Sequence, residues 1–445
     1  MDTTEPSGHG WGAPPPARRG GGRVLAVALA AAVGLTVAAF ALRPAPPAGR
    51  PAARAAQPPP AADRAAEVNR LLQRRARAIV GGDRAGFLAT VDRRRPAYYQ
   101  AQASLFARLR TVPFSAFSYQ LLGRGRDLAS DAVRRRYAPE QVYLPPVEAR
   151  YRFEGQDASP VLARFFYTFV RTRSGWRIGG QGDARAGRDD AEIWDAGRVA
   201  SVRTGRTLVV YHPGDELLAG RLEAAAERAY GQVAATWNGR WEHKVVILVP
   251  HDQAEAERLV GARDLSRVAA VAASSIESGP VHRVLGNRIV VNPANVRDDN
   301  RLPLQIVVTH EMTHVATRTL GEGQPLLLAE GFADYTALRA LGLPLAATRP
   351  DLARAVREGR FDGRLPGDAA FHGAGAALAY DEASSFCRWV ASSYGEDRLR
   401  ALYRAFTGPR KPDAAGLDLG IRHALGISEA AAQARWAAWV RQQLR

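Results

Sequence analysis

Cysteine, methionine and lysine are all scarce in this chain of 445 residues. It contains one cysteine and two methionines, and only Lys244 and Lys411 among its 61 basic residues are lysines. A single cysteine, Cys387, excludes an intrachain disulfide and any zinc cluster built from several cysteines. A tightly bound transition metal must therefore be held by histidines and carboxylates.

The net charge of +17 could indicate a polyanionic partner. Almost all of the excess is arginine in an alanine-rich chain, a bias typical of a GC-rich bacterial genome. No stretch interleaves basic and aromatic residues as nucleic-acid-binding modules do. We therefore expect no nucleic-acid partner, whereas attraction to an anionic cell envelope stays open.

Residues 24–42 carry no charge over 19 residues, which as a helix span about 28 Å, close to the hydrocarbon thickness of a bilayer. Three arginines lie just before this run: Arg18, Arg19 and Arg23. They favour a cytoplasmic N-terminus. We predict a single transmembrane anchor helix over 23–42, with the rest of the chain extracytoplasmic. The alternative is a secreted protein with a cleaved signal peptide, although the nearest A-x-A pattern, at 53–55, lies far past the apolar run.

Composition then divides the chain. Residues 1–22 are rich in glycine and proline and predict a disordered cytoplasmic tail, and residues 43–62 predict a Pro/Ala-rich linker. In residues 63–183, a helical pattern is followed by several segments that alternate apolar and polar residues, as in the strands of one sheet. This order predicts an accessory α+β domain and resembles, in pattern only, a nuclear-transport-factor-like cone.

A second unit is expected over 193–445. Strand-like runs at 193–212, 244–250 and 287–293 enclose a helix at about 216–237, and the remainder is mainly helical. The whole chain is therefore predicted to be α+β: an anchor, a cone-like domain, and a domain that combines a small β-sheet with a mainly helical C-terminal half.

The stretch "VVTHEMTHVATR" (307–318) contains the spacing H-E-x-x-H. On a helix, His310 and His314 lie one turn apart on the same face, so both imidazoles can bind one ion. Glu311 lies beside the first histidine, where its carboxylate can face a metal-bound water. By itself the pattern also fits two hydrogen-bonded histidines on an amphipathic helix.

The segment "AEGFADY" begins after a further short loop. Glu330 follows His314 after 15 intervening residues, and Asp334 lies four residues further on. A catalytic zinc requires three protein ligands and one open position, and Glu330 can supply the third as an oxygen ligand. Asp334 is placed to accept the N–H of a ligand histidine, which would fix its tautomer. Together the two motifs predict a Zn²⁺ site.

The motif "THEMTH…PLLLAEGFADY" resembles the gluzincin clan of zinc peptidases, most closely the bacterial MA-like peptidase family. Leu327 stands where that family often has tryptophan, which affects packing. The similarity continues through "AYDEASSFCRWVASSYGEDRLRALYRAF" (379–406) and the closing helix "ALGISEAAAQARWAAWV", so that it covers about 193–445. It implies a thermolysin-like fold for this part of the chain.

The resemblance implies one Zn²⁺ per chain, held by His310, His314 and Glu330, with Glu311 as general base toward the zinc-bound water and Asp334 behind a ligand. Tyr380 and His372, which follow the two metal-binding helices, are candidates for stabilising the oxyanion. The strand "RIVVN" is expected to be the edge that pairs with an extended peptide, which makes Asn292 a candidate for substrate binding.

The remaining histidines lie outside any ligand spacing and are expected to be ordinary surface or loop residues, among them His212, His251, His282 and His423.

The sequence thus predicts a membrane-anchored, extracytoplasmic zinc metallopeptidase that acts on a peptide or protein. One alternative is a surface binding or scaffolding protein that keeps the peptidase fold without turnover. Another is a zinc hydrolase of a non-peptide amide in the cell envelope. The sequence leaves the oligomeric state open.

Overall fold

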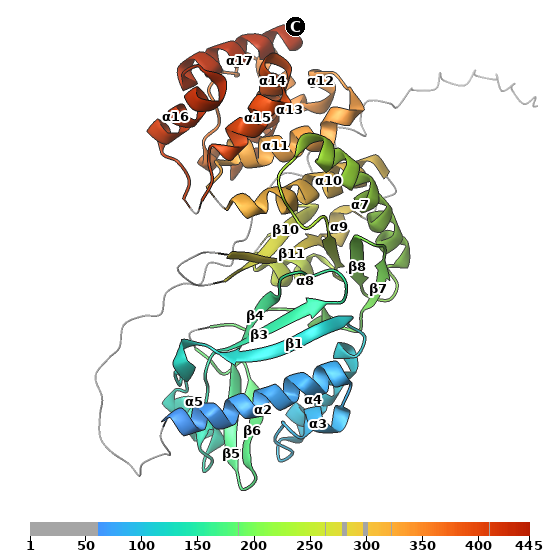
Figure 1. Cartoon of the computed structure of the whole chain (residues 1–445), viewed down its shortest axis with the longest axis vertical. Helices are drawn as coiled ribbons and strands as arrows, with labels where there is room; N and C mark the ends of the chain where they lie inside the picture. Colours follow the sequence, from blue (N-terminus) through green and yellow to red (C-terminus); the bar gives the residue numbers. More distant parts are fainter. Residues whose placement is uncertain are drawn as a thin grey trace, which may run out of the picture.

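Three parts follow one another along the long axis of the molecule (Figure 1). The computed structural model describes residues 61–185, 187–262, 264–277, 283–296, 301–321, 323–408 and 410–445. The N-terminal α+β part and the C-terminal helices lie at opposite ends, and a five-stranded sheet lies between them.

The N-terminal part opens with three helices, the first of them long, and continues mainly as strands. Its helices are α2 (Ala61–Gly81), α3 (Arg84–Leu88), α4 (Pro96–Leu109), η1 (Gly123–Gly125) and α5 (Asp131–Tyr137). Its strands are β1 (Phe114–Leu121), β2 (Val142–Tyr143), β3 (Val147–Phe153), β4 (Val161–Phe165), β5 (Tyr167–Thr172) and β6 (Gly175–Gln181). The apolar stripe of α2, which includes Val68, Leu72 and Ile79, is buried because residues at this spacing share one helix face.

The strands of this part form two sheets, so the prediction of one sheet is wrong. One sheet has the order β1-β3-β4 and the other the order β2-β5-β6. The apolar run that contains β4 and β5 leaves the first sheet after Phe165 and enters the second at Tyr167. Phe166 between them packs into a small separate core with Val133 and Val170. An unbroken apolar run cannot reveal such a change of sheet.

The central sheet has the order β10-β11-β9-β8-β7. Its strands are β7 (Ala200–Arg203), β8 (Thr207–Tyr211), β9 (Val245–Val249), β10 (Ala270–Glu277) and β11 (Arg283–Val291). Strands β8, β9 and β11 are parallel, and β7 and β10 are antiparallel edges. The "RIVVN" segment belongs to β11, which lies inside the sheet, so the prediction that it forms the edge is wrong.

Both faces of this sheet are buried. Alternate residues of β9 point to opposite sides: Val245, Ile247 and Val249 join the core shared with the C-terminal helices, whereas Val246 and Leu248 join the core shared with the N-terminal part. A strand buried on both faces reads as a continuous apolar run, as "VVILV" does. The N-terminal part therefore packs directly on the sheet that carries the C-terminal helices.

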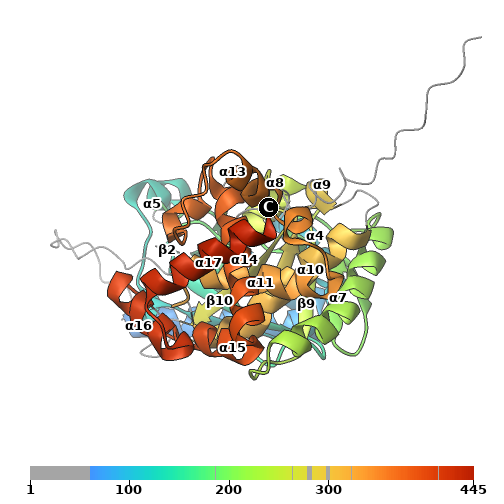
Figure 2. The same ribbon diagram turned by 90° about the horizontal axis from the view of Figure 1, so that it is seen from above.

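Helices make up the rest of the chain. They are α6 (Ile193–Ala196), α7 (Glu216–Thr236), α8 (Gln253–Val260), α9 (Pro293–Val296), α10 (Arg301–Thr317), η2 (Arg318–Leu320), α11 (Leu326–Leu338), η3 (Arg339–Leu341), α12 (Leu345–Thr348), α13 (Pro350–Arg357), η4 (Asp368–Phe371), α14 (Ala376–Tyr394), α15 (Glu396–Arg404), α16 (Ala414–Leu425) and α17 (Glu429–Gln443). Viewed from above, α10 and α11 lie between α7 and α14 (Figure 2).

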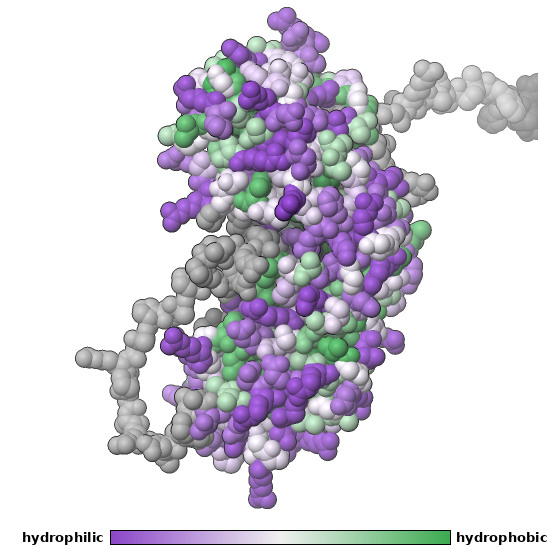
Figure 3. Space-filling view, in the orientation of Figure 1, coloured by the Kyte–Doolittle hydropathy of each residue, from purple (hydrophilic) through white to green (hydrophobic). Residues whose placement is uncertain are grey.

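The face of the molecule drawn in Figure 3 is mainly polar. On this face, hydrophilic residues predominate and apolar ones are scattered among them. Large apolar side chains that stand exposed, such as Leu217 and Leu419, lie on different helices. Among the described residues, most large apolar side chains therefore lie in the cores.

Among the described residues, no helix is both long and apolar enough to cross a membrane. The anchor expected over 23–42 and the tail expected over 1–22 lie outside the described residues, as does nearly all of the linker expected over 43–62. Helix α2 begins at Ala61, two residues before the expected start of the accessory domain.

Gly331→Ala should destabilise the protein, because α11 and α14 approach each other closely at this position. A Cβ at Gly331 would lie 2.4 Å from the carbonyl oxygen of Ala383 and 2.9 Å from Sγ of Cys387. We expect a loss of about 1–3 kcal/mol in the free energy of unfolding, measured by guanidinium denaturation. Gly231→Ala on α7, where a Cβ meets nothing within 4 Å, is the control and should be neutral or stabilising. Equal stability of the two variants would contradict this packing.

Candidate metal centre

The centre forms where α10 and α11 cross. Helix α10 is held on α7 by the hydroxyl of Thr309, which donates to Oε1 of Gln232 at 2.6 Å. The chain then turns back at Gly321, whose φ of +94° is in the region that favours glycine. A Cβ there would also lie 2.6 Å from the carbonyl oxygen of Gly408. This turn lets α11 return across α10.

The structure brings the three predicted ligands together. Nε2 of His310 and Nε2 of His314 are 3.0 Å apart. Oε2 of Glu330 lies 3.3 Å from the first of these nitrogens and 3.5 Å from the second. All three side chains are buried. His310 and His314 therefore share one face of α10, as their spacing predicts, and that face is turned toward Glu330 on α11.

Asp334 lies behind this triangle. Its Oδ1 is 2.9 Å from Nδ1 of His310. Nδ1 therefore carries a proton and donates a hydrogen bond to the carboxylate, and Nε2 faces the other two ligands. The second oxygen of Asp334 is paired with Nη2 of Arg349 at 3.2 Å. Arg349 is itself buried and also donates to the hydroxyl of Ser384 on α14. A chain of contacts thus fixes His310 from α11, the start of α13 and α14.

The carboxylates of the centre differ in their pKa values. Burial would raise the pKa of Glu330, but the charge of His314 and the hydrogen bonds with both histidines lower it strongly. Burial likewise opposes ionisation of Asp334, but the charge of Arg349 together with the hydrogen bond and charge of His310 outweighs burial and lowers the pKa. For Glu311 burial dominates and the pKa is raised, although His310 and His314 oppose it. Glu330 and Asp334 are therefore fixed anions, and Glu311 is the stronger base.

Glu311 is oriented by the edge of the central sheet. Its Oε2 accepts a hydrogen bond of 2.7 Å from the backbone N–H of Ala272 on β10. Apolar residues of α10 such as Met312 and Val308 pack into the hydrophobic core. The carboxylate is thus held between the two histidines and the edge strand.

Tyr380 faces the centre, and His372 does not. Tyr380 lies on α14, is buried, and has a pKa raised first by burial and then by Glu330, Asp334 and Glu311. Its hydroxyl therefore stays protonated and can donate a hydrogen bond. His372 is exposed just after η4, and no described contact joins it to the centre. Instead, the neighbouring Phe371 packs against the ring of Tyr380.

Asn292 has a structural position. It is buried at the end of β11, where its Nδ2 donates to the carbonyl oxygen of Leu265 at 2.8 Å and its Oδ1 accepts the N–H of Ala294. These bonds occupy the side chain within the loop. The structure therefore does not place Asn292 where an extended peptide would pair.

Sequence reasoning missed two contacts of the centre and one further cluster. Arg349 and the N–H of Ala272 come from segments that carry no motif. His212 lies in a loop, as one part of its prediction allowed, but it is fully buried rather than a surface residue and lies beside His251 and Glu255. The signal that could have revealed the cluster was a histidine just after each of two apolar strands, in "VVYH" and "ILVPH".

Comparisons with known proteins give a coarse likeness only. No protein-family profile matches the chain, and no curated protein matches it in sequence. Similar solved structures include an M1 zinc metallopeptidase from Deinococcus radiodurans (TM-score 0.31, 15% identity, 55% of this chain and 52% of the other). A Glu-to-Ala mutant of an M1 zinc metallopeptidase from the same organism is also similar (TM-score 0.32, 13% identity, 73% of this chain and 70% of the other). A third similar structure is a two-domain M1 zinc metallopeptidase mutant bound to L-tryptophan (TM-score 0.30, 13% identity, 73% of this chain and 69% of the other).

The chain thus spans about half the length of the first of these structures. The similarity is too low to assign a family, and the function proposed below rests on the geometry of the centre.

Asp334→Asn should weaken zinc binding, because the amide has no charge with which to hold the Nδ1 proton of His310. Loss of such a partner typically costs about 10- to 100-fold in metal affinity. Competition with a chromophoric chelator measures the dissociation constant. Asp351→Asn, which removes a partly exposed carboxylate paired with Arg354, is the control. Equal zinc affinities in the two variants would show that Asp334 does not position the ligand.

Proposed function

We propose that this protein is a zinc metallopeptidase whose centre is formed by His310, His314 and Glu330. The observation that carries the proposal is the triangle of ligand atoms, with sides of 3.0, 3.3 and 3.5 Å. Ligands at about 2.0–2.2 Å from a tetrahedral Zn²⁺ are separated by about 3.3–3.5 Å. The three atoms therefore fit one ion with little rearrangement.

The donor set supports a catalytic role for the ion. Two imidazoles and one carboxylate leave a fourth position open for water, as catalytic zinc sites require. A bound Zn²⁺ would supply a water of lowered pKa and polarise the substrate carbonyl. Cys387, the only cysteine, is buried on α14 and has a pKa raised by burial to well above its usual value, so the thiol is a poor ligand.

Glu311 is the proposed general base. Its raised pKa makes it a better proton acceptor than an exposed glutamate, and the N–H of Ala272 holds one oxygen in place. It takes a proton from the attacking water and then delivers it to the leaving amine. Tyr380, whose phenol is kept protonated, is the proposed donor to the oxyanion.

An extended peptide is the substrate that suits the surroundings. Strand β10 is an edge of the central sheet, and among the described residues it pairs with β11 alone. It also contacts Glu311 through Ala272. We propose that a substrate strand pairs along β10, which takes the role first expected of β11, and that its carbonyl is thereby directed to the ion.

We also propose that the enzyme is a single-pass membrane protein with its catalytic part outside the cytoplasm. The uncharged run over 24–42 and the arginines before it support this location. The proline-rich stretch that follows is suited to hold the folded part away from the bilayer.

Glu311→Gln should abolish peptide hydrolysis and leave zinc in place. Loss of a general base lowers turnover by about 10²- to 10⁴-fold, whereas the three ligands are untouched. The measurement combines cleavage of a broad peptide library with zinc analysis of the same preparations. Chelation should also stop cleavage in the wild-type protein, and added Zn²⁺ should restore it.

Glu358→Gln, at an exposed glutamate paired with Arg360, serves as the matched control and should cleave like the wild type. If the wild type and Glu311→Gln give the same cleavage profile, the peptidase proposal fails and a scaffolding role is favoured. If neither cleaves peptides but the wild type hydrolyses envelope amides, the reaction type holds and the substrate class is wrong.

A further inference from the structure

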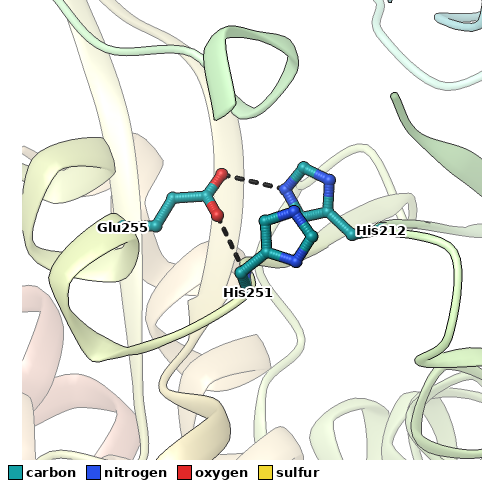
Figure 4. Close-up of side chains that lie close together, drawn as sticks. All are labelled: His212, His251 and Glu255. Atoms are coloured by element: carbon teal, nitrogen blue, oxygen red, sulfur yellow. Dashed lines mark hydrogen bonds and ion pairs between the residues drawn. The ribbon is translucent and has the colours of Figure 1, made fainter. Parts of the chain in front are cut away.

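A second cluster of potential metal ligands lies at the carboxyl ends of two parallel strands. His212 directly follows β8, and His251 lies two residues after the end of β9. Parallel neighbours end at the same edge of a sheet, so the two histidines meet there. Glu255, on the first turn of α8, completes the group (Figure 4). One ligand atom from each of the three residues lies within 4.8 Å of the other two.

The orientation of His212 is fixed by two hydrogen bonds. Its Nδ1 is 2.9 Å from the carbonyl oxygen of Arg198, and since a carbonyl only accepts, Nδ1 carries a proton. Nε2 then faces Oε1 of Glu255 at 3.0 Å. A histidine that donates Nδ1–H to a backbone carbonyl and presents Nε2 is in the arrangement typical of a metal ligand.

Glu255 is equally constrained. Its Oε2 accepts the backbone N–H of His251 at 2.8 Å, which leaves Oε1 directed at His212. The ring of His251 is stacked on that of His212, with centroids 3.6 Å apart and an angle of 9° between the rings. His212 and Glu255 are buried and His251 is exposed, so the group opens to solvent on the side of His251.

The charges around the cluster favour a cation. Burial lowers the pKa of His212, but its hydrogen bonds to Glu255 and Arg198, together with the charges of Glu255 and Asp215, outweigh burial and raise it. Asp195 on α6 also interacts electrostatically with Glu255, and Asp252 caps α8 beside it. Carboxylates at the start of α7 and on α6 and α8 therefore interact with the group or lie beside it.

We propose that His212, His251 and Glu255 form a second divalent-metal site, separate from the catalytic centre. The proton between Nε2 of His212 and Oε1 of Glu255 occupies the place that the ion would take. Their separation of 3.0 Å is close to that of two ligands on one Zn²⁺, about 3.3 Å. Two imidazoles and a carboxylate suit Zn²⁺ among divalent ions.

His251 must rotate to complete the site. Two stacked rings cannot both direct a nitrogen at one ion, because a ligand nitrogen points in the plane of its ring. A ligand atom of His251 already lies within 4.8 Å of those of His212 and Glu255, so a turn of its ring out of the stacked plane would direct a ring nitrogen at the ion. Binding of the ion would therefore separate the stacked rings of His212 and His251 and make both of them metal ligands.

The location gives this ion a structural role. Arg198, whose carbonyl oxygen orients His212, belongs to the segment between α6 and β7 that connects the N-terminal part to the central sheet. Gly197 lies against both imidazoles, since a Cβ there would be 3.2 Å from His251 and 3.3 Å from His212. An ion at this site would fasten the connecting segment to the ends of β8 and β9.

The test is a zinc titration of the metal-stripped full chain by calorimetry, with metal analysis of the reloaded protein. We expect two Zn²⁺ per chain in the wild type. His251→Ala and Glu255→Gln should each retain one, and so should His314→Ala, which disables the catalytic centre instead. Combining His251→Ala with His314→Ala should leave none. His423→Ala, at an exposed histidine on α16, is the control and should retain two.

His251 is exposed, so its replacement tests the site even if Glu255→Gln fails to fold. A wild type that binds one ion, lost in His314→Ala and kept in His251→Ala, would overturn the second site and leave the proposed peptidase intact. A second ion that survives both His251→Ala and Glu255→Gln would also overturn it. Peptidase activity that disappears only in His314→Ala would show that the two sites act independently.

Discussion

The hydrogen bond between Asp334 and His310 across α11 and α10 is the contact on which the metal centre depends. It sets which nitrogen of His310 faces the other ligands, and it links the two helices that supply all three of them. A buried carboxylate is unstable unless its charge is compensated, and Asp334 is compensated on its other side by Arg349. The centre is therefore held by paired charges as well as by helix packing.

Several buried charges gather in one helical core. Glu311, Glu330 and Asp334 all lie within it, and His310, His314 and Arg349 oppose them. Such a group is costly to bury and adds little to stability by itself. The proposed function accounts for its presence, because a divalent cation placed between the ligand atoms would be stabilised by the same carboxylates.

The double-sided burial of the central sheet determines where the chemistry lies. One face carries α7 and α10, and the other carries the N-terminal part. Since both faces are covered, the remaining ways to approach the sheet are its edges and strand ends. Glu311, the proposed general base, is hydrogen bonded to the β10 edge, and the second histidine cluster lies at the ends of β8 and β9. Both sites thus follow from the same architecture.

The features that the sequence predicted are local ones. The helix spacing of His310 and His314, and that of Glu330 and Asp334, depends only on residues one turn apart, so it could be read directly. The identity of the edge strand could not be predicted, because nothing in "RIVVN" shows that another strand, β10, pairs with its outer side. Arg349 and His212 reach their partners through tertiary packing between distant segments. The change of sheet at Phe166 also depends on tertiary packing, so the sequence could not predict it.

A crystal structure of the zinc-loaded protein with anomalous scattering at the zinc edge tests the central claim most directly. We expect an anomalous peak about 2.0–2.2 Å from Nε2 of His310, Nε2 of His314 and an oxygen of Glu330, with Nδ1 of His310 still bound to Asp334. A protein that shows no zinc between these three residues, or zinc held there without Glu330, would contradict the account.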